Sequence, residues 1–199
     1  KEGRQRDARV INTSSGAVAF DEAKMARVME QAVKRATEAQ KPVKPAAVVI
    51  KSDVDEPLYK TPENADNFAL VIGIGKYSEI PEAQFAERDA EAVRDHLKAM
   101  GYPERNIISL IGSKASKTGM AKIIETWLPL NVTENSTVFF YYSGHGAPDT
   151  KSGQAYLVPW DGDPQFLEDT AYPIKQLYEK LNSLKAKRVI VAMDSCFSG

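Results

Sequence analysis

Apolar runs of strand length alternate with amphipathic stretches of helix length between residues 67 and 193, and this alternation restricts the fold more than any other feature. The runs that predict buried strands cover residues 68–74, 107–111, 137–142 and 188–193. The stretches that predict helices cover residues 87–100, 118–128 and 173–184. Strands that alternate with helices form right-handed βαβ units, so the sequence predicts an α/β fold with a mainly parallel sheet. Residues 155–158 predict one short strand outside this pattern.

The predicted helices each carry one apolar face, which indicates that they pack on the sheet. The residues predicted to face inward are Ala90, Val93, Leu97 and Met100; Ile123, Ile124, Trp127 and Leu128; and Ile174, Leu177, Tyr178, Leu181 and Leu184. Four strands are few for such a sheet, and they leave an edge strand that needs a partner. We therefore expect further strands to come from sequence that follows Gly199.

The first 66 residues predict an N-terminal extension. Residues 21–39 predict an amphipathic helix with Asp21 as its N-cap, and its apolar stripe either packs on the neighbouring domain or docks a partner. Residues 40–66 contain four prolines among charged residues and predict a linker. We therefore expect a separate domain over residues 67–199, and because residue 1 is Lys1 and not methionine, a longer precursor.

The composition excludes several classes of protein. A formal net charge of -1 gives no long-range field that would favour nucleic acid or an anionic membrane. No apolar run reaches 18 residues, so the sequence predicts no transmembrane helix. The single cysteine forms no intramolecular disulfide, and it leaves the compartment open between cytoplasm and periplasm. Two histidines and one cysteine also give no zinc-ligand spacing, so no metal or other cofactor is expected on this ground.

The only cysteine and one histidine follow the last two predicted strands. The strand over 137–142 runs into the sequence SGHG, which contains His145, and the strand over 188–193 runs into DSCFSG, which contains Cys196. Because ligand sites in open parallel sheets lie at the carboxyl ends of strands, we expect these two side chains to share a cleft. The other histidine, His96, falls within a predicted helix and is expected on its solvated face.

A cysteine and a histidine in this arrangement can cleave an acyl bond. The imidazole of His145 can take the thiol proton of Cys196, and the thiolate then attacks a carbonyl carbon. The backbone N–H groups of Gly146 and Cys196 are candidates for an oxyanion hole. Alone, each side chain has an ordinary structural role, the cysteine as a small apolar residue and the histidine as a solvated one. Their joint position after two core strands favours chemistry.

The motifs SGHG and DSCFSG, with the strand FALVIGIGKY and the helix segment AERDAEAVRDHL, resemble the caspase and metacaspase superfamily, and bacterial caspase-like peptidases in particular. The separation of 51 residues between His145 and Cys196 agrees with the roughly 50 residues that are typical of caspases. The resemblance implies a three-layer α/β/α sandwich and a cysteine endopeptidase, made as a zymogen, with a Cys196–His145 dyad. It also implies a small-subunit segment after Gly199 and a peptide or protein substrate.

The resemblance also predicts the specificity of cleavage. Animal caspases carry a QAC-type motif where this chain has DSCFSG, which argues against cleavage after aspartate. Asp89, Ser143 and Asp194 match residues that line the metacaspase pocket for the residue before the scissile bond. Two carboxylates in a narrow cleft attract a cation, so cleavage after Arg or Lys is expected. The alternative is that Asp89 caps its helix and Asp194 only shapes a turn.

Other signals in the sequence lead to weaker hypotheses. The acidic residues that could bind calcium, as some metacaspases do, are Asp161, Asp163, Glu168 and Asp169, although their spacing does not match an EF-hand. The glycines at 73 and 75 lack the third glycine of a dinucleotide loop, so nucleotide binding is not expected. Candidate self-processing sites are Lys41, Lys44, Lys51 and Lys60. Two alternative functions stay open: a catalytically silent caspase-like docking module, and a hydrolase or transferase acting on a non-peptide acyl group.

Overall fold

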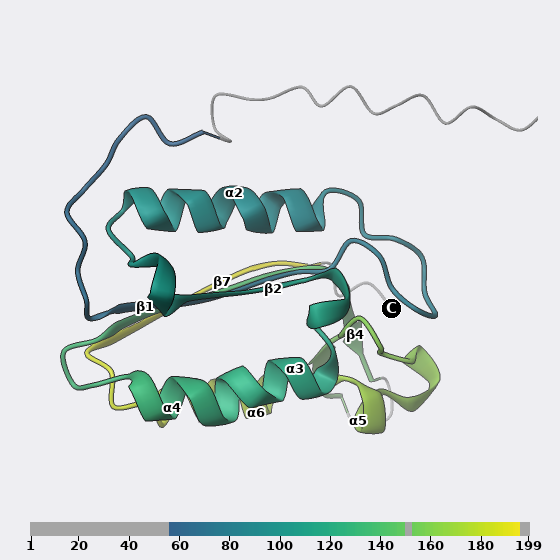
Figure 1. Cartoon of the computed structure of the whole chain (residues 1–199). Helices are drawn as coiled ribbons and strands as arrows, with labels where there is room; N and C mark the ends of the chain where they lie inside the picture. Colours follow the sequence, from purple (N-terminus) through teal and green to yellow (C-terminus); the bar gives the residue numbers. More distant parts are fainter. Residues whose placement is uncertain (1–55, 150–152, 196–199) are drawn as a thin grey trace, which may run out of the picture. The chain divides into compact units, whose positions relative to one another are not determined.

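A four-stranded parallel sheet organises the computed structural model of the chain, which describes residues 56–149 and 153–195 (Figure 1). Its strands are β1 (Asn67–Gly73), β2 (Ile107–Ile111), β3 (Thr137–Ser143) and β7 (Arg188–Asp194). They lie in the order β2-β1-β3-β7, and every pairing is parallel. The predicted parallel α/β fold is confirmed, and the four predicted strands agree with the observed ones to within one residue at each end.

Helices cover both faces of this sheet and produce three layers (Figure 1). The helix α2 (Ala86–Ala99) lies on one face. The other face carries α3 (Lys117–Lys122), η4 (Ile123–Trp127), α4 (Leu128–Asn131) and α6 (Ile174–Asn182). Because the strands are covered on both faces, their side chains are apolar almost without interruption, as in other parallel sheets.

Two apolar clusters hold the layers together, one on each face of the sheet. Beneath α2, Ala69 and Val71 of β1 pack against Ala90 and Leu97 of the helix. On the opposite face a larger cluster joins β1 and β3 to the remaining helices. Its fully buried members are Leu70, Ile72, Ile74, Ala115, Met120, Ile124, Leu128, Val138, Phe140, Tyr142, Leu157 and Leu177.

Gly73 lets α2 approach β1 closely. A Cβ atom at Gly73 would lie 2.5 Å from the Cβ of Ala90 and 2.7 Å from the carbonyl oxygen of Ala86. A side chain at this position would therefore push α2 off the sheet. The role of this glycine is close packing between helix and strand.

The helix predicted over 118–128 is longer and less regular than expected. Helical structure extends from Lys117 to Asn131, and its middle part, η4, is a π-helix. Pro129 explains the irregularity, because it has no N–H to complete the usual hydrogen bond to the residue four positions earlier.

Two inward-facing predictions for the helices are wrong. Met100 is 42% exposed, because α2 ends at Ala99 and Met100 serves as its C-cap. Tyr178 of α6 is 41% exposed, while Leu177 and Leu181 form the buried stripe of this helix. The predicted helix over 21–39, the linker up to residue 55 and Cys196 lie outside the described residues. No helix in the described part of the chain is both long and apolar enough to cross a membrane.

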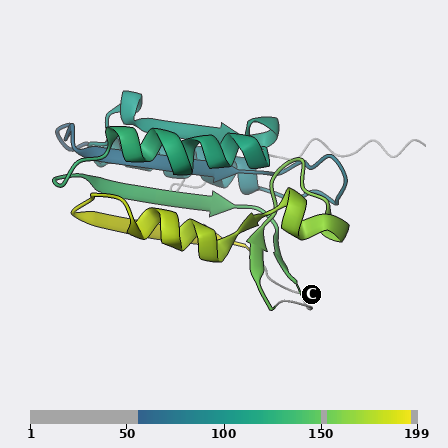
Figure 2. The same cartoon turned by 90° about the horizontal axis from the view of Figure 1, so that it is seen from below.

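A second, small sheet lies beyond the carboxyl ends of the parallel strands (Figure 2). It is antiparallel and has the order β4-β5-β6. Its strands are β4 (Gly146–Pro148), β5 (Ala155–Leu157) and β6 (Tyr172–Pro173). The short helices η5 (Pro164–Phe166) and α5 (Leu167–Thr170) connect β5 to β6. Because β4 starts directly after His145, this sheet forms one border of the predicted cleft.

Candidate active site

β3 and β7 bring the two sequence motifs to the same edge of the parallel sheet. The strands are direct neighbours, and Ser143 at the end of β3 pairs with Asp194 at the end of β7. The backbone N–H of Gly144 donates to the carbonyl oxygen of Asp194 at 3.3 Å. His145 is therefore two residues beyond the pair on one strand. Cys196, which the structure does not describe, is two positions beyond Asp194 in the sequence that follows β7.

The ring of His145 contacts the loop that follows β1. Its Nε2 atom lies 3.0 Å from the carbonyl oxygen of Pro81, and its ring centroid is 4.9 Å from that of Tyr77. A carbonyl oxygen can only accept a hydrogen bond, so Nε2 carries a proton in this arrangement. In the neutral ring, Nδ1 of His145 is then the unprotonated nitrogen, which is the atom that can act as a base.

Two tyrosine hydroxyls hold the backbone of His145. Its N–H donates to the hydroxyl of Tyr77 at 2.7 Å, and its carbonyl accepts from the hydroxyl of Tyr142 at 2.7 Å. Burial raises the pKa of Tyr77, and hydrogen bonds to His145 and Tyr142 offset part of this rise. Burial also raises the pKa of Tyr142 well above its ordinary value, and the neighbouring Tyr77 raises it further. Both phenols therefore stay neutral at any pH near 7.

The three predicted pocket residues all influence the pKa of Tyr141 of β3. Burial raises the pKa of Tyr141, a hydrogen bond with Ser143 lowers it, and the charges of Asp89 and Asp194 raise it. Ser143 is buried, Asp194 is exposed, and Asp89 lies in the first turn of α2. The N-cap of α2 is Phe85, so Asp89 is not the cap of this helix. Ser143 and Asp194 thus occupy paired positions of β3 and β7. Asp89 lines a pocket together with Tyr141, on the side of the sheet that α2 covers.

A family model matches the part of the chain that forms this fold. The model for the caspase domain, Peptidase_C14, matches residues 66–199. The chain belongs to the caspase-domain family. The predicted caspase-like fold and resemblance are therefore confirmed, and at the level of the family they support a cysteine-type peptidase.

Two curated relatives are each similar to about two thirds of the chain. A probable protease of a Desulfuromonadales bacterium is 27% identical over 149 residues, which cover 65% of this chain and 18% of the relative. Metacaspase-1 of Eremothecium gossypii is 25% identical over 146 residues, which cover 66% of this chain and 31% of the relative. The chain thus spans less than a third of the length of either protein.

Several residues of this caspase-domain site carry no signal in the sequence. Tyr77 and Pro81 reach His145 across 68 and 64 positions of sequence, and no periodicity marks them. Phe85, at the end of the same loop, has a φ of 71° and is 59% exposed, with the guanidinium of Arg88 5.1 Å from its ring centroid. A positive φ is costly for an aromatic residue, and such strain is typical of functional loops.

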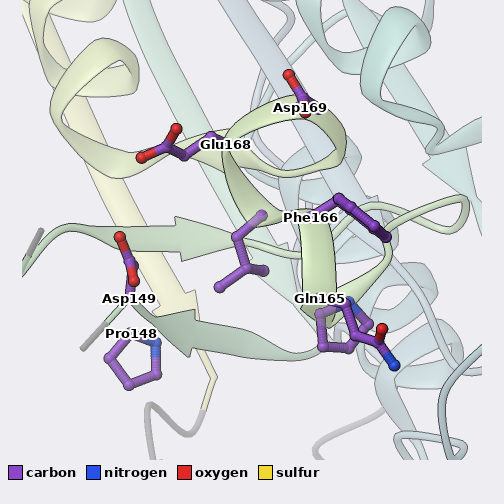
Figure 3. A pocket seen from close by; sticks show the side chains of 8 residues that line it. Pro148, Asp149, Gln165, Phe166, Glu168 and Asp169 are labelled. Atoms are coloured by element: carbon purple, nitrogen blue, oxygen red, sulfur yellow. The ribbon is translucent and has the colours of Figure 1, made fainter. Parts of the chain in front are cut away.

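A pocket of about 530 Å³ lies between β4 and the helices η5 and α5 (Figure 3). The side chain of Asp169 lies across the α5 ribbon from Pro148 and Asp149 (Figure 3). The lining residues are Pro148, Asp149, Pro164, Gln165, Phe166, Leu167, Glu168 and Asp169. Its wall includes two residues of the acidic segment that suggested calcium, Glu168 and Asp169.

The contacts of this acidic segment do not fit a calcium site. Asp161 and Asp163 each accept a backbone N–H at 2.8 Å, from Lys117 and Gln165. Lys117 also places its ammonium group 2.7 Å from the carbonyl oxygen of Asp169. Within the described ranges, no three acidic, histidine or cysteine side chains converge closely enough to hold a metal ion. We therefore assign no step of the chemistry to calcium.

Proposed function

We propose that the chain is a cysteine endopeptidase in which Cys196 is the nucleophile and His145 the general base. The observation that supports this most directly is the pairing of Ser143 with Asp194. Adjacent parallel strands lie about 4.8 Å apart, so the segments that leave them can hold their side chains within reach of one another. The Pro81 carbonyl supports the same proposal, since it fixes the proton of His145 on Nε2 and leaves Nδ1 as the base.

The proposed reaction proceeds through a thioester. Nδ1 of His145 takes the thiol proton, and the thiolate of Cys196 adds to the carbonyl carbon of the scissile bond. The backbone N–H groups of Gly146 and Cys196 stabilise the resulting oxyanion. The C–N bond then breaks, the proton on Nδ1 passes to the leaving amine, and a thioester remains. Water, deprotonated by the same nitrogen, hydrolyses the thioester and restores the thiol.

We propose that the substrate carries Arg or Lys immediately before the scissile bond. Asp89 and Asp194 place two carboxylates near the buried hydroxyl of Ser143 around Tyr141. A cationic side chain would gain from both charges, and an arginine could bind a carboxylate through two parallel hydrogen bonds. An aspartyl side chain at the same place would be repelled.

We also propose that a small-subunit segment, following Gly199 in the sequence, pairs with β7. In the described part of the chain β7 has one neighbour, β3, and its residues from Val189 to Met193 are only partly buried. The corresponding residues of β1, which has neighbours on both sides, are buried. An additional strand would satisfy the free backbone groups of β7 and complete the cleft. Residues 1–199 alone should then show little activity, and co-expression with the following segment should restore it.

Labelling of the single cysteine tests the proposed function. In the chain co-expressed with the segment that follows Gly199, an arginyl ketone that alkylates thiols should modify Cys196 at least about 100-fold faster than it modifies free cysteine, because the site binds the probe and activates the thiol. His145→Ala should abolish this excess rate, while His96→Ala should retain it. Mass spectrometry of the peptide that contains Cys196, the one cysteine of residues 1–199, identifies the modified residue.

Different outcomes of this experiment separate the alternatives. Labelling no faster than that of free cysteine would favour a catalytically silent docking module. Fast labelling without hydrolysis of any peptide substrate would favour an enzyme that acts on a non-peptide acyl group. Hydrolysis of peptides by the wild type, lost in Cys196→Ala, supports the peptidase.

A further inference from the structure

The loop between β1 and α2 holds His145 at three points, and one residue of this loop supplies two of them. Tyr77 accepts the backbone N–H of His145 and stacks its ring against the imidazole, while Pro81 accepts the proton on Nε2. We infer that Tyr77 is a positioning residue, which sets the orientation of the general base without touching the substrate. This inference rests on the proposed role of His145 in peptide hydrolysis.

The hydroxyl proton of Tyr142 points to two backbone carbonyl oxygens. The hydroxyl of Tyr142 lies 2.7 Å from the carbonyl oxygen of His145 and 2.9 Å from that of Val158. Neither carbonyl can donate, so the one proton of Tyr142 must point to them. The side chain of Tyr142 is therefore a donor to the backbone of His145.

The two phenols therefore hold both backbone polar groups of His145. The N–H of His145 donates to the hydroxyl of Tyr77, and the hydroxyl of Tyr142 donates to the carbonyl of His145. Val158 adds a second donor, since its N–H lies 3.0 Å from the same carbonyl. With both backbone polar groups of His145 fixed, its Cα–Cβ bond has one direction, and only rotation of the ring is left for Pro81 to fix.

Gly144 shows how closely the phenols approach this segment. A Cβ atom at Gly144 would lie 2.6 Å from the hydroxyl oxygen of Tyr77 and 3.0 Å from that of Tyr142. The space beside the peptide that precedes His145 is therefore occupied by these two hydroxyl groups. The SGHG motif has glycine at its second position because the tyrosines contact the backbone there.

A second Tyr–His pair in the chain provides a matched control. The hydroxyl of Tyr59 lies 3.0 Å from Nδ1 of His96, and the two ring centroids are 5.9 Å apart. This pair connects the start of the described chain to α2, away from the edge where the motifs meet. Tyr77→Phe and Tyr59→Phe thus remove the same atom from two tyrosines that each contact a histidine.

The test compares the two variants in the full-length enzyme. Tyr77→Phe should lower kcat about 10-fold to 100-fold, because a base displaced by a fraction of an ångström loses its alignment. KM should change less than about twofold, since Tyr77 does not bind substrate. Tyr59→Phe should change neither constant. A Tyr77→Phe variant with wild-type kcat, or an equal loss in Tyr59→Phe, would overturn the inference.

A spectroscopic measurement tests the positioning without relying on peptidase activity. Residues 1–199 contain two histidines, and the ¹⁵N resonances of their imidazoles can be assigned by comparison with His96→Ala and His145→Ala. Wild-type His145 should show its neutral-form proton on Nε2, and Tyr77→Phe should shift it toward a mixture of tautomers. His96 should not change. An unchanged His145 spectrum in Tyr77→Phe would contradict the inference, even if the wild type hydrolysed no peptide.

Tyr142→Phe provides a second variant if Tyr77→Phe does not fold. It removes the donor to the carbonyl of His145 and leaves the ring contact of Tyr77 intact. The same loss of kcat with little change in KM, and the same change in the His145 spectrum, are expected. A folded Tyr142→Phe enzyme with wild-type kcat and spectrum would show that the backbone hydrogen bonds of His145 do not position the base, and would overturn the inference.

Discussion

Ser143 pairs with Asp194 across β3 and β7, and the N–H of the next residue, Gly144, donates to the carbonyl oxygen of Asp194 at 3.3 Å. The pair therefore ties the backbone of the histidine motif to the backbone of the cysteine motif. Ser143, Asp194 and Asp89 also all influence the pKa of Tyr141. One register thus fixes the relative position of the two motifs and assembles the candidate specificity pocket.

The charges of this pocket should decide the preferred substrate. In a peptide series that differs only before the scissile bond, the wild type should favour Arg over Asp. Asp89→Asn and Asp194→Asn should each lower kcat/KM for the arginyl peptide about tenfold, or ~1.4 kcal/mol, because each removes one attractive charge. Asp89 and Asp95 each have an arginine next to them in the sequence, Arg88 at 3.9 Å and Arg94 at 3.0 Å. Asp95→Asn, on the same helix, is therefore the control and should have no effect. A preference for aspartyl peptides would contradict the pocket assignment and leave the proposed dyad untouched.

Gly144→Ala should destabilise the fold by about 1–3 kcal/mol, because its Cβ would overlap the hydroxyl of Tyr77. The double variant Gly144→Ala/Tyr77→Phe removes the atom at 2.6 Å and leaves the milder contact with Tyr142 at 3.0 Å. Urea unfolding should show that the double variant loses less stability than the sum of the two single variants. Strict additivity would mean that the hydroxyl of Tyr77 is not the atom that excludes a side chain.

Stability should fall at alkaline pH because several tyrosines are held neutral, Tyr142 and Tyr172 most strongly. Burial raises the pKa of Tyr142, and burial with a hydrogen bond to Glu125 raises that of Tyr172. A group with a raised pKa in the folded state stabilises the fold below about pH 10, the unfolded value, and loses this contribution above it. Urea unfolding between pH 8 and 11 should therefore be constant at first and weaken above about pH 10.

Tyr172→Phe should flatten this decline, whereas Tyr178→Phe, at an exposed position, should not. Tyrosinate absorbance adds a second readout, since Tyr142 and Tyr172 should ionise only as the protein unfolds. A full complement of tyrosinate in a protein that is still folded would contradict the assigned cause.

Two leucines give a direct measure of the energy in the larger core. Leu70 of β1 is fully buried, and Leu130 of α4 is 79% exposed. Leu70→Ala should cost about 2–5 kcal/mol through lost burial and a residual cavity, and Leu130→Ala less than about 0.5 kcal/mol. Chemical denaturation measures both. A similar cost at the two positions would show that Leu70 does not lie in the core described above.

Hydrophobic periodicity was sufficient to predict the parallel sheet and its helices. The strands are covered on both faces, so each appears in the sequence as an apolar run with clear ends. The motifs that follow β3 and β7 were enough to place the carboxyl ends of these two strands at the same edge of the sheet. The second sheet could only be predicted in part. Its strand β5 was expected, but β4 and β6 have three and two residues, which is too short for any periodicity.

The contacts that position His145 could not be predicted from the sequence. Tyr77 and Pro81 lie in an irregular loop, and their partners depend on how that loop folds over the sheet edge. The exposed side of α6 was missed for a related reason. Tyr178 fits the helical stripe by spacing, but the neighbouring Leu177 faces the core instead.

The order of strands in the sheet has a consequence for synthesis of the chain. β1 is made first, yet it pairs with β3, where Asn67 meets Thr137, 70 positions later in the sequence. At about 5–20 residues per second, a ribosome needs about 4–14 s to supply that partner. During this interval the edge of β1 that will pair with β3 lacks its final neighbour. Such long-range pairings fold slowly. The nascent chain therefore exposes its most buried strand for seconds, which makes early chaperone binding to residues 67–73 a physical expectation of this topology.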